Sequence, residues 1–168
     1  MHLIPVNKSE RHYSICKSWL EERETTKWLS SPLRFSKYLR IIHDMLIADK
    51  KNRIFFIYDA ERPVGIIGLS NIDRVDKKAE LWCVIGSKSD RGKNYATTAN
   101  GLIKSIACKE MGLQSLHAFV AESNKGARRF LEKSGFFFAG KFRKAFFIDG
   151  SYQDFLIFDW VNPEANKH

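Results

Sequence analysis

Two glycines and three cations fall within one short segment of the sequence: Gly86, Lys88, Arg91, Gly92 and Lys93. An apolar run ends at Ile85 before this segment, and a helical pattern starts near Asn94 after it. A helix start offers backbone N–H groups without intrahelical acceptors, together with the positive end of the helix dipole. Glycine lets a phosphate approach that backbone closely, and cations add attraction over a longer range. The segment therefore predicts a loop that binds a diphosphate.

Two common phosphate-binding patterns do not fit this loop. The Rossmann pattern GxGxxG fails because Gly86 and Gly92 have the wrong spacing and no second close glycine is present. The Walker pattern GxxxxGK[ST] fails because five residues, instead of four, separate the two glycines. In addition, Asn94 stands where the hydroxyl that binds magnesium should be.

A third pattern fits better. The loop resembles the (Gln/Arg)-x-x-Gly-x-(Gly/Ala) signature of the GCN5-related N-acetyltransferase (GNAT) family in six residues: Arg91, Gly92, Lys93, Asn94, Tyr95 and Ala96. Arg91 and Ala96 match the two ends, whereas Asn94 replaces the usual glycine. Asn best tolerates a left-handed backbone after glycine, so the replacement should preserve the loop. The resemblance implies that these residues bind the pyrophosphate of acetyl-CoA.

Further segments resemble the RimJ/RimL-like branch of this family. They are residues 79–81 before the loop, 94–99 within it, 124–136 after it and the turn at 149–154. The resemblance covers roughly residues 64–161. It implies direct transfer of an acetyl group from acetyl-CoA to an amine.

An amine acceptor requires a base, because most alkylamines are protonated at neutral pH and cannot attack in that form. Glu80 is the first candidate, since it begins a strand amid apolar residues and the RimJ/RimL-like branch often has Glu at this place. The competing interpretation is an ion pair between Glu80 and Lys77 or Lys78. Glu122 is the reserve candidate for the base.

The strand before the loop has a second implied role. In the resembled fold this strand bulges and parts from the next strand, and the pantetheine arm lies in the gap. The matching residues are Cys83, Val84 and Ile85, whose backbone groups we expect to contact the cofactor. Backbone N–H groups there can stabilise developing negative charge on a carbonyl oxygen. Cys83 as a covalent nucleophile is disfavoured, because no His lies near it in sequence.

The general acid is harder to assign. Many relatives place Tyr seven residues after the Asn that starts the last helix, and counting from Asn124 reaches Leu131. Ser123 or water could replace the tyrosine, or the thiolate could leave unassisted. Asn124 is expected to cap this helix and contact coenzyme A. The cations Lys125, Arg128 and Arg129 are candidates for its 3′-phosphate, with Arg128 preferred.

The periodicity along the chain predicts an α+β fold in the order β-α-α-β-β-β-α-β-α-β-β, with a mixed, mostly antiparallel sheet flanked by helices. Helices are expected from Ser9 to about Trp28 and from Phe35 to Leu46, because apolar residues recur there at helical spacing. A break at Ser30-Ser31-Pro32 separates them. Asp149-Gly150 predicts a two-residue hairpin between the last two strands.

The composition indicates one globular domain over residues 1–168. The three cysteines, Cys16, Cys83 and Cys108, lie far apart, and no Cys/His cluster suggests a metal site. We find no signal peptide and no apolar stretch of ~18 residues, so we expect a cytoplasmic protein without a membrane partner. It should act as a monomer or homodimer.

The net charge of +9 favours an anionic partner. The first two expected helices carry a mixed set of charges, including Glu24, Arg34 and Lys37. A polyamine acceptor should require a clearly acidic pocket, so an amino sugar or nucleotide-linked amino sugar suits the charge better. A protein N-terminus, ribosomal or otherwise, is the second acceptor candidate. A non-catalytic CoA-binding regulator remains an alternative, whereas no motif supports nucleic-acid binding.

Overall fold

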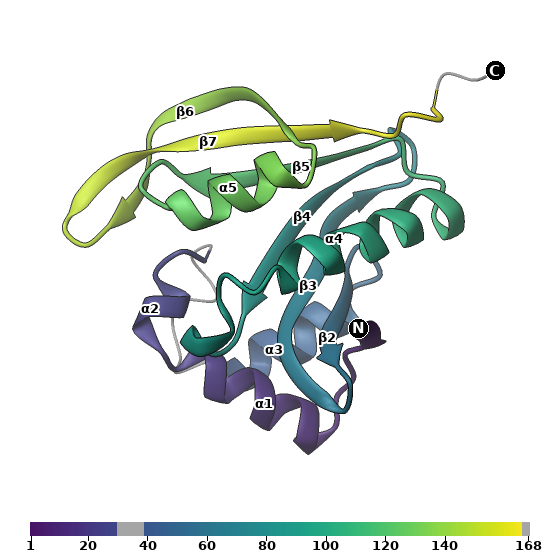
Figure 1. Ribbon diagram of the computed structural model, residues 1–168, viewed down its shortest axis with the longest axis vertical. Helices are drawn as coiled ribbons and strands as arrows, with labels where there is room; N and C mark the ends of the chain where they lie inside the picture. The colour runs from purple at the N-terminus through teal and green to yellow at the C-terminus, as the bar shows by residue number, and fades with distance from the viewer. Residues whose placement is uncertain (30–38, 166–168) are drawn as a thin grey trace.

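The computed structural model describes residues 1–29 and 39–165. The elements follow one another as β1 (His2–Pro5), α1 (Glu10–Leu20), α2 (Arg23–Thr26), α3 (Leu39–Ala48), β2 (Arg53–Asp59), β3 (Arg62–Asp73), β4 (Lys78–Ile85), α4 (Tyr95–Ser105), β5 (Ser115–Ala121), α5 (Lys125–Lys133), β6 (Phe137–Ile148) and β7 (Ser151–Val161) (Figure 1). A short 3₁₀ turn, Lys88–Asp90, precedes α4, and a π-helical turn, Ile106–Glu110, extends it. The predicted α+β class is confirmed.

The first predicted helix is wrong in its length. It begins as expected, with the Ser9 hydroxyl accepting a hydrogen bond from the His12 N–H, but it ends at Leu20. Glu22 is extended and starts the separate helix α2, in which two buried β-branched threonines lower helix propensity. The second predicted helix begins at Phe35, which lies outside the described residues together with the predicted break at 30–32. None of the helices in the described parts is long and apolar enough to cross a membrane.

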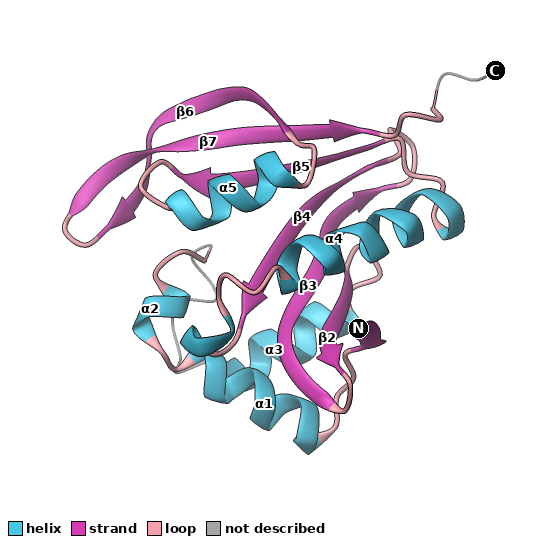
Figure 2. Cartoon of the chain, in the orientation of Figure 1, coloured by secondary structure: helices cyan, strands magenta, loops and turns pink. Residues whose placement is uncertain are grey.

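The described strands form one seven-stranded sheet in the order β1-β2-β3-β4-β5-β7-β6. All neighbouring strands are antiparallel except β4 and β5, which run parallel (Figure 2). β1 is an edge strand, as Pro5 predicted. The sheet is thus mixed but mostly antiparallel, as expected.

Each face of the sheet buries a different apolar cluster, because successive strand residues point to opposite sides. Ile57, Ile67 and Leu81 pack with Ala99 and Ile103 of α4 on one face. On the other face Phe56, Ile66 and Trp82 pack against α1 and α3, and these residues form the second cluster with Cys16 and Ile47. Helices therefore lie on both faces of β3 and β4, and they enclose the middle of the sheet (Figure 1).

The parallel pair β4 and β5 is short. Its register runs from Lys78 opposite Ser115 to Glu80 opposite His117 and then stops. Beyond Glu80, β4 stays paired with β3 as far as Ile85, and β5 stays paired with β7 as far as Ala121, but the two strands no longer pair with each other. The two strands consequently diverge toward their carboxyl ends (Figure 1). This divergence confirms that the strand before the loop parts from its neighbour.

The prediction that β4 itself bulges is wrong. Residues 81–85 pair with β3 without a register shift, and the irregularity lies in β3 between Ser70 and Asp73. Asn71 takes a positive φ of 52° there. The extra residue therefore bends β3 opposite the start of β4, and it leaves β4 itself regular.

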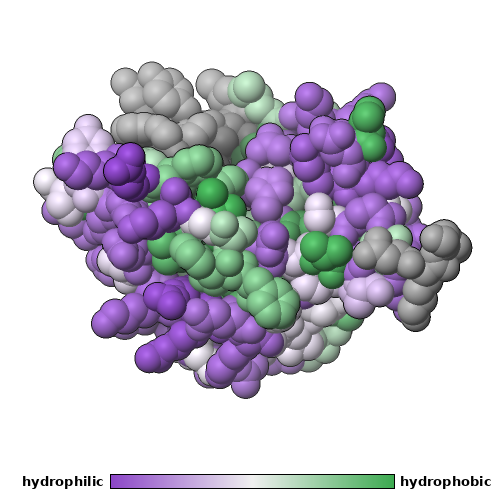
Figure 3. All heavy atoms as spheres, turned by 90° about the horizontal axis from the view of Figure 1, so that it is seen from above, coloured by the Kyte–Doolittle hydropathy of each residue, from purple (hydrophilic) through white to green (hydrophobic). Residues whose placement is uncertain are grey.

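The β6–β7 hairpin carries aromatic residues on its surface. Asp149 and Gly150 both have positive φ, as the predicted two-residue turn requires. Phe137 and Phe138 are 75% and 59% exposed, and Phe142 is also exposed. Figure 3, which views the molecule from above Figure 1, shows apolar residues in a band across this side.

The first prediction concerns Gly68, which allows Trp82 to lie flat against β3. A Cβ at Gly68 would lie 2.6 Å from two indole carbons of Trp82, whose Nε1 donates to Ser70 Oγ at 2.7 Å. Gly68→Ala should therefore lower the free energy of unfolding in urea by about 1–3 kcal/mol, the usual cost of overpacking.

Gly101 in α4 offers a matched control, since a Cβ there would have no neighbour within 4 Å. Gly101→Ala should leave stability unchanged or raise it by about 0.5–1 kcal/mol. Equal stabilities for the two variants would show that the packing of Trp82 against β3 does not require a glycine at position 68.

Candidate active site

The space between the diverging strands is a cleft of about 770 Å³. Residues 80–85 of β4 and 118–121 of β5 form two of its walls. The loop before α4, α2 and the start of α5 line one end, and residues of α3 and β3 lie at the other, beside Glu80. A concave site of this size suits an elongated small molecule.

The loop at the first end has the backbone of an anion site. Gly92 and Asn94 have φ of +82° and +63°, so the predicted left-handed conformation of Asn94 is confirmed. In the described part of the chain, no backbone or side-chain acceptor receives a hydrogen bond from the N–H groups of residues 92–97. These amides lie at the positive end of α4, and they are free for a diphosphate. The arrangement therefore fits the pyrophosphate of acetyl-CoA.

A buried carboxylate fixes this loop. Asp90 is 3% exposed, and it accepts hydrogen bonds from Arg62 at 2.6 and 3.1 Å and from Lys93 at 3.1 Å. The bond from Arg62 is the main cause that lowers the pKa of Asp90 to about 2. Asp90 is thus ionised at neutral pH, and the two cations hold the turn in front of α4.

Two more contacts join the loop to neighbouring elements. The Arg91 guanidinium donates to the Thr25 hydroxyl of α2 at 2.8 Å, and the Tyr95 hydroxyl donates to Asp59 at 2.7 Å. The Asp59 bond is the main cause that raises the pKa of Tyr95. Both side chains are therefore engaged with the protein, and the free groups of the loop are its amides.

Glu80 lies at the point where β4 and β5 separate. Asn71 Nδ2 donates to Glu80 Oε2 at 3.0 Å, and the bulge in β3 brings the two side chains together. Within the described residues Glu80 forms no ion pair, and Lys78 pairs with Asp76 instead. The competing interpretation, an ion pair between Glu80 and Lys77 or Lys78, is therefore not found among the described residues. The Glu80 side chain lines the cleft.

Most of the predicted site residues line the cleft: Glu80, Cys83, Val84, Ile85, Arg91, Gly92, Asn94, Tyr95, Ala96 and Asn124. Lys93 and Arg128 are not among the lining residues, since Lys93 binds Asp90 and Arg128 binds Glu132 at 2.9 Å. The neighbouring Arg129 and Lys133 line it instead. Adjacent residues of a helix point in different directions. The cluster of cations therefore predicted a basic helix, but it did not predict which of its side chains line the cleft.

The reserve candidates for catalysis lie outside the cleft. Glu122 is exposed, and the Ser123 hydroxyl donates to Gln153. Asn124 caps α5 as predicted, with its Oδ1 accepting from the Ala127 N–H at 3.1 Å. Leu131 is 2% exposed and lines the cleft with a side chain that cannot donate a proton. The Ser123 hydroxyl is therefore engaged with Gln153 and does not line the cleft.

Cys83 has the surroundings of a packing residue. Burial raises the pKa of its thiol to about 12, so almost no thiolate is present at neutral pH. Across the parallel pair, His117 lies opposite Glu80 and not opposite Cys83, and burial is the main cause that lowers the pKa of His117. These properties agree with the expectation that Cys83 is not a nucleophile.

The second end of the cleft is acidic, in contrast to the chain as a whole. Its charged lining residues are Asp49 after α3 and Glu80, whereas Glu24 of α2 lines the cleft near the loop before α4 and pairs with Lys27 at 2.8 Å. The cations that line the cleft, Arg91, Arg129 and Lys133, come from the loop before α4 and from α5. Asn71 and Asp49 were missed by the sequence analysis. An asparagine that interrupts an apolar strand is a possible signal for the first, but no local pattern marks the second.

No group of three or more His, Cys, Asp or Glu side chains in the described residues is placed to hold a metal ion.

Comparison with known proteins gives consistent matches. A family model described as acetyltransferase (GNAT) domain matches residues 2–137. Spermidine N(1)-acetyltransferase of Escherichia coli K12 is 27% identical over 149 residues, which are 89% of this chain and 75% of that protein. A putative ribosomal N-acetyltransferase of Bacillus subtilis is 30% identical over 100 residues, 60% of this chain and 54% of that protein.

Among solved structures, spermidine N-acetyltransferase from Vibrio cholerae in complex with CoA and spermine superposes with a TM-score of 0.84. It is 22% identical, and the match covers 95% of this chain and 94% of the other. This likeness shows that the two chains share a fold.

The left-handed conformation of Asn94 gives the second prediction. Asn94→Val should weaken CoA binding about 5- to 30-fold, because a side chain with φ near +60° costs about 1–2 kcal/mol. Asn94→Gly should keep the dissociation constant within about threefold, since glycine adopts this backbone freely. Calorimetry with CoA measures both. Equal binding by the two variants would contradict the role of this backbone.

Proposed function

This chain belongs to the GNAT acetyltransferase family, and we propose that its acceptor is a small cationic amine of the polyamine class. The chain is an acetyl-CoA-dependent N-acetyltransferase that acts on an amine. The observation that carries the proposal is the pair of carboxylates Asp49 and Glu80 in the lining of the cleft. Both lie beside the same part of β3, because Asn71 donates to Glu80 and the next residue, Ile72, donates to the Lys51 carbonyl. Carboxylates there attract an ammonium group and disfavour a phosphate.

The choice of a cationic acceptor replaces the amino sugar favoured by the net charge. Net charge describes the whole surface, whereas an acceptor meets only the groups that line its site. The relatives named as spermidine N-acetyltransferases support the same class. An anionic amino sugar finds no support in the relatives or in the charges around the acceptor end.

The residues that would hold acetyl-CoA come from three elements. We assign the pyrophosphate to the amides of residues 92–97, and the pantetheine arm to the backbone of Cys83, Val84 and Ile85. Arg129 and Lys133 replace Arg128 as candidates for the 3′-phosphate, because they line the cleft. When bound, acetyl-CoA supplies the acetyl thioester that the amine attacks.

Glu80 is the proposed base. The acceptor arrives as an ammonium ion, and its nitrogen can attack only after losing a proton. The bond from Asn71 holds one Glu80 oxygen and leaves the other available to accept that proton, directly or through a water molecule. Because β4 continues from Glu80 toward Ile85, the base lies on the same strand as the expected thioester contacts.

We propose no side-chain acid for the leaving thiolate. Leu131 stands where relatives have a tyrosine, and its side chain has no acidic proton. The Ser123 hydroxyl donates its proton to Gln153. A thiolate has a moderate pKa, so it can leave without direct protonation. Water at the open side of the cleft then supplies the proton.

A protein N-terminus is the second candidate acceptor. The relative named as a putative ribosomal N-acetyltransferase favours it, as does the resemblance to the RimJ/RimL-like branch. An acidic site can accept the positive α-amino group as well as a polyamine. A cytoplasmic location, a single domain over residues 1–168 and a monomeric or homodimeric state stay part of the proposal.

The third prediction tests Glu80. Glu80→Gln keeps the bond geometry with Asn71 but removes the proton acceptor, so kcat at saturating acetyl-CoA should fall by about 100-fold or more. Calorimetry should find CoA binding unchanged. Glu122→Gln is the matched control, because Glu122 lies outside the cleft, and it should retain full turnover. Normal turnover by Glu80→Gln would exclude Glu80 as the base.

The fourth prediction tests the acceptor class by thiol release from acetyl-CoA. Spermidine should exceed glucosamine and nucleotide-linked amino sugars in kcat/KM by at least about tenfold, with N-terminal peptides in the same screen. Asp49→Asn should raise the KM for spermidine about two- to fivefold, because one exposed carboxylate is lost.

Asp76→Asn is the control for Asp49→Asn, since Asp76 is an exposed residue that pairs with Lys78 and does not line the cleft. Preference for an amino sugar would contradict the proposed class. Preference for peptides would favour the second candidate. CoA binding without thiol release from any amine would indicate a non-catalytic regulator.

A further inference from the structure

We infer that Phe119 is an acceptor-binding residue, and that the face of its ring that turns to the cleft holds an ammonium group of the acceptor by a cation–π interaction. This inference rests on the proposed function, because the ammonium group belongs to the amine that is acetylated. It adds a specificity-determining side chain on β5 to the carboxylates Asp49 and Glu80 on the opposite side of the cleft.

Phe119 lies close to the proposed base, on the side of the sheet that carries α1 and α3. His117 is opposite Glu80 at the end of the parallel pair, and Phe119 follows His117 by two residues on β5. Residues two apart on a strand point to the same face, as do residues that pair across strands. Phe119 and Glu80 therefore project to one face, and both line the cleft. Ala118 and Val120 point to the other face, where they pack in the cluster that contains α4.

The aromatic side chain that follows Glu80 on β4 leaves the gap between the strands open. Trp82 is two residues beyond Glu80, so it projects to the same face. Its indole lies against Gly68 of β3, and its Nε1 donates to Ser70 of that strand at 2.7 Å. β3 lies on the side of β4 away from β5, so Trp82 leans away from the gap. Phe119 therefore borders the gap from the side of β5.

A row of stacked rings fixes the orientation of Phe119. Its ring stacks with Phe155 of β7 and with Phe142 of β6, with centroids 5.5 and 6.2 Å apart and ring planes at 20° and 25°. Phe155 stacks in turn with Phe146 at 4.8 Å. β7 and β6 both lie on the side of β5 away from β4. Among the described rings, the row therefore ends at Phe119, and the outer face of that ring turns to the cleft.

The surroundings of this ring face favour a cation. The face of an aromatic ring is negative, and it attracts an ammonium group that lies within about 6 Å of the ring centroid. The carboxylates of Glu80 and Asp49 line the same cleft and add negative charge. Burial lowers the pKa of His117, whose ring meets Phe119 edge to face at 5.5 Å, so this imidazole is mostly neutral at neutral pH.

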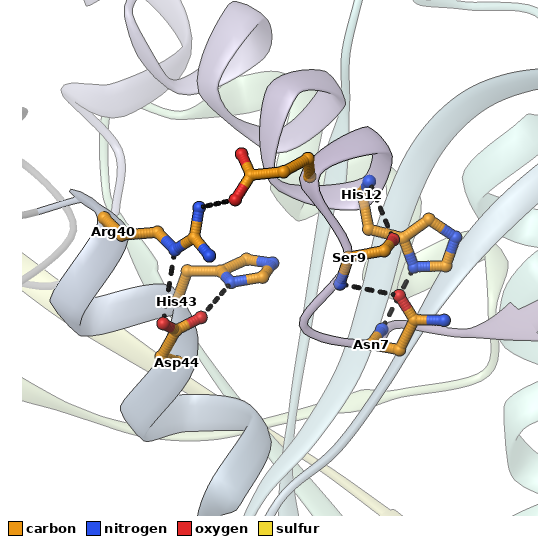
Figure 4. Close-up of polar contacts among 7 residues, drawn as sticks. Asn7, Ser9, His12, Arg40, His43 and Asp44 are labelled. Carbon is orange, nitrogen blue, oxygen red and sulfur yellow. Dashed lines mark hydrogen bonds and ion pairs between the residues drawn. The ribbon is translucent and has the colours of Figure 1, made fainter.

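Cations of the protein do not occupy this ring face. Arg40 of α3 is bonded to Glu10 at 2.6 Å and to Asp44 at 3.2 Å, and Figure 4 shows its guanidinium between the two carboxylates. Lys27, directly after α2, lies 5.0 Å from the ring centroid of the next residue. In the part of the chain that the structure describes, no Lys or Arg lies over the ring of Phe119. The ring face is thus available to the acceptor.

Incorporation of a trifluorinated phenylalanine at position 119 tests the inference, because fluorine weakens the negative ring face and changes the shape of the ring little. Calorimetry of the CoA-bound protein measures acceptor binding without turnover. The Kd for spermidine should rise about three- to thirtyfold. The Kd for a neutral diol of the same chain length should change less than about twofold, since it carries no charge. An unchanged Kd for spermidine would overturn the inference.

Phe119→Leu gives a second test by kinetics. It should raise the KM for spermidine about threefold or more, while the KM for acetyl-CoA stays unchanged, because α4 and α5 pack on the other face of the sheet. Phe138→Leu is the matched control, since Phe138 is 59% exposed, packs against Phe158 and does not line the cleft. It should behave as the wild type. If Phe119→Leu fails to fold, the fluorinated protein decides, because it keeps the row of rings.

The outcomes separate this inference from the proposed function. Normal acetylation of spermidine, with equal binding by the fluorinated protein, would overturn the role of Phe119 and leave the acceptor class intact. Binding of spermidine that weakens on fluorination, without acetylation of any amine, would support the role of Phe119 and overturn the proposed function. An equal loss of affinity for spermidine and for the diol would assign the ring to packing and contradict the inference. No binding of spermidine by the wild type would overturn both.

Discussion

The short parallel contact between β4 and β5 is the constraint on which the site depends. The two strands pair only from Lys78 to Glu80, whereas β4 pairs with β3 as far as Ile85 and β5 pairs with β7 as far as Ala121. A continuous parallel pair would fill the cleft with backbone hydrogen bonds and leave no groups for a ligand. The pair ends at Glu80, which is the proposed base. As a result, Glu80, the backbone groups of residues 83–85 and the amides before α4 all face one opening.

Charge acts locally in this protein. The surplus of nine positive charges describes the surface, yet several cations are already bound to carboxylates, as Arg62 is to Asp90 and Lys141 is to Asp154. Carboxylates, by contrast, line the acceptor end of the cleft. If the proposed cationic acceptor is correct, the net charge predicts the wrong sign for it, because net charge averages over groups that an acceptor never meets.

The sequence patterns predicted the features that depend on residues close together in the chain. Period-two and helical spacing located the strands and most of the helices, and the tolerance of Asn for positive φ predicted the conformation of Asn94. The break at Glu22 and the bond from Asn71 to Glu80 could not be found this way. They arise from tertiary contacts or from a one-residue bulge, neither of which leaves a periodic signal.

The central claim is that a diphosphate binds the unpaired amides of residues 92–97. Titration of ¹⁵N-labelled protein with CoA tests it directly, because backbone amide resonances report each N–H group separately. The account predicts that the largest shifts, and new protection from hydrogen exchange, occur at these amides. Shifts concentrated elsewhere, with residues 92–97 unchanged at saturating CoA, would contradict it.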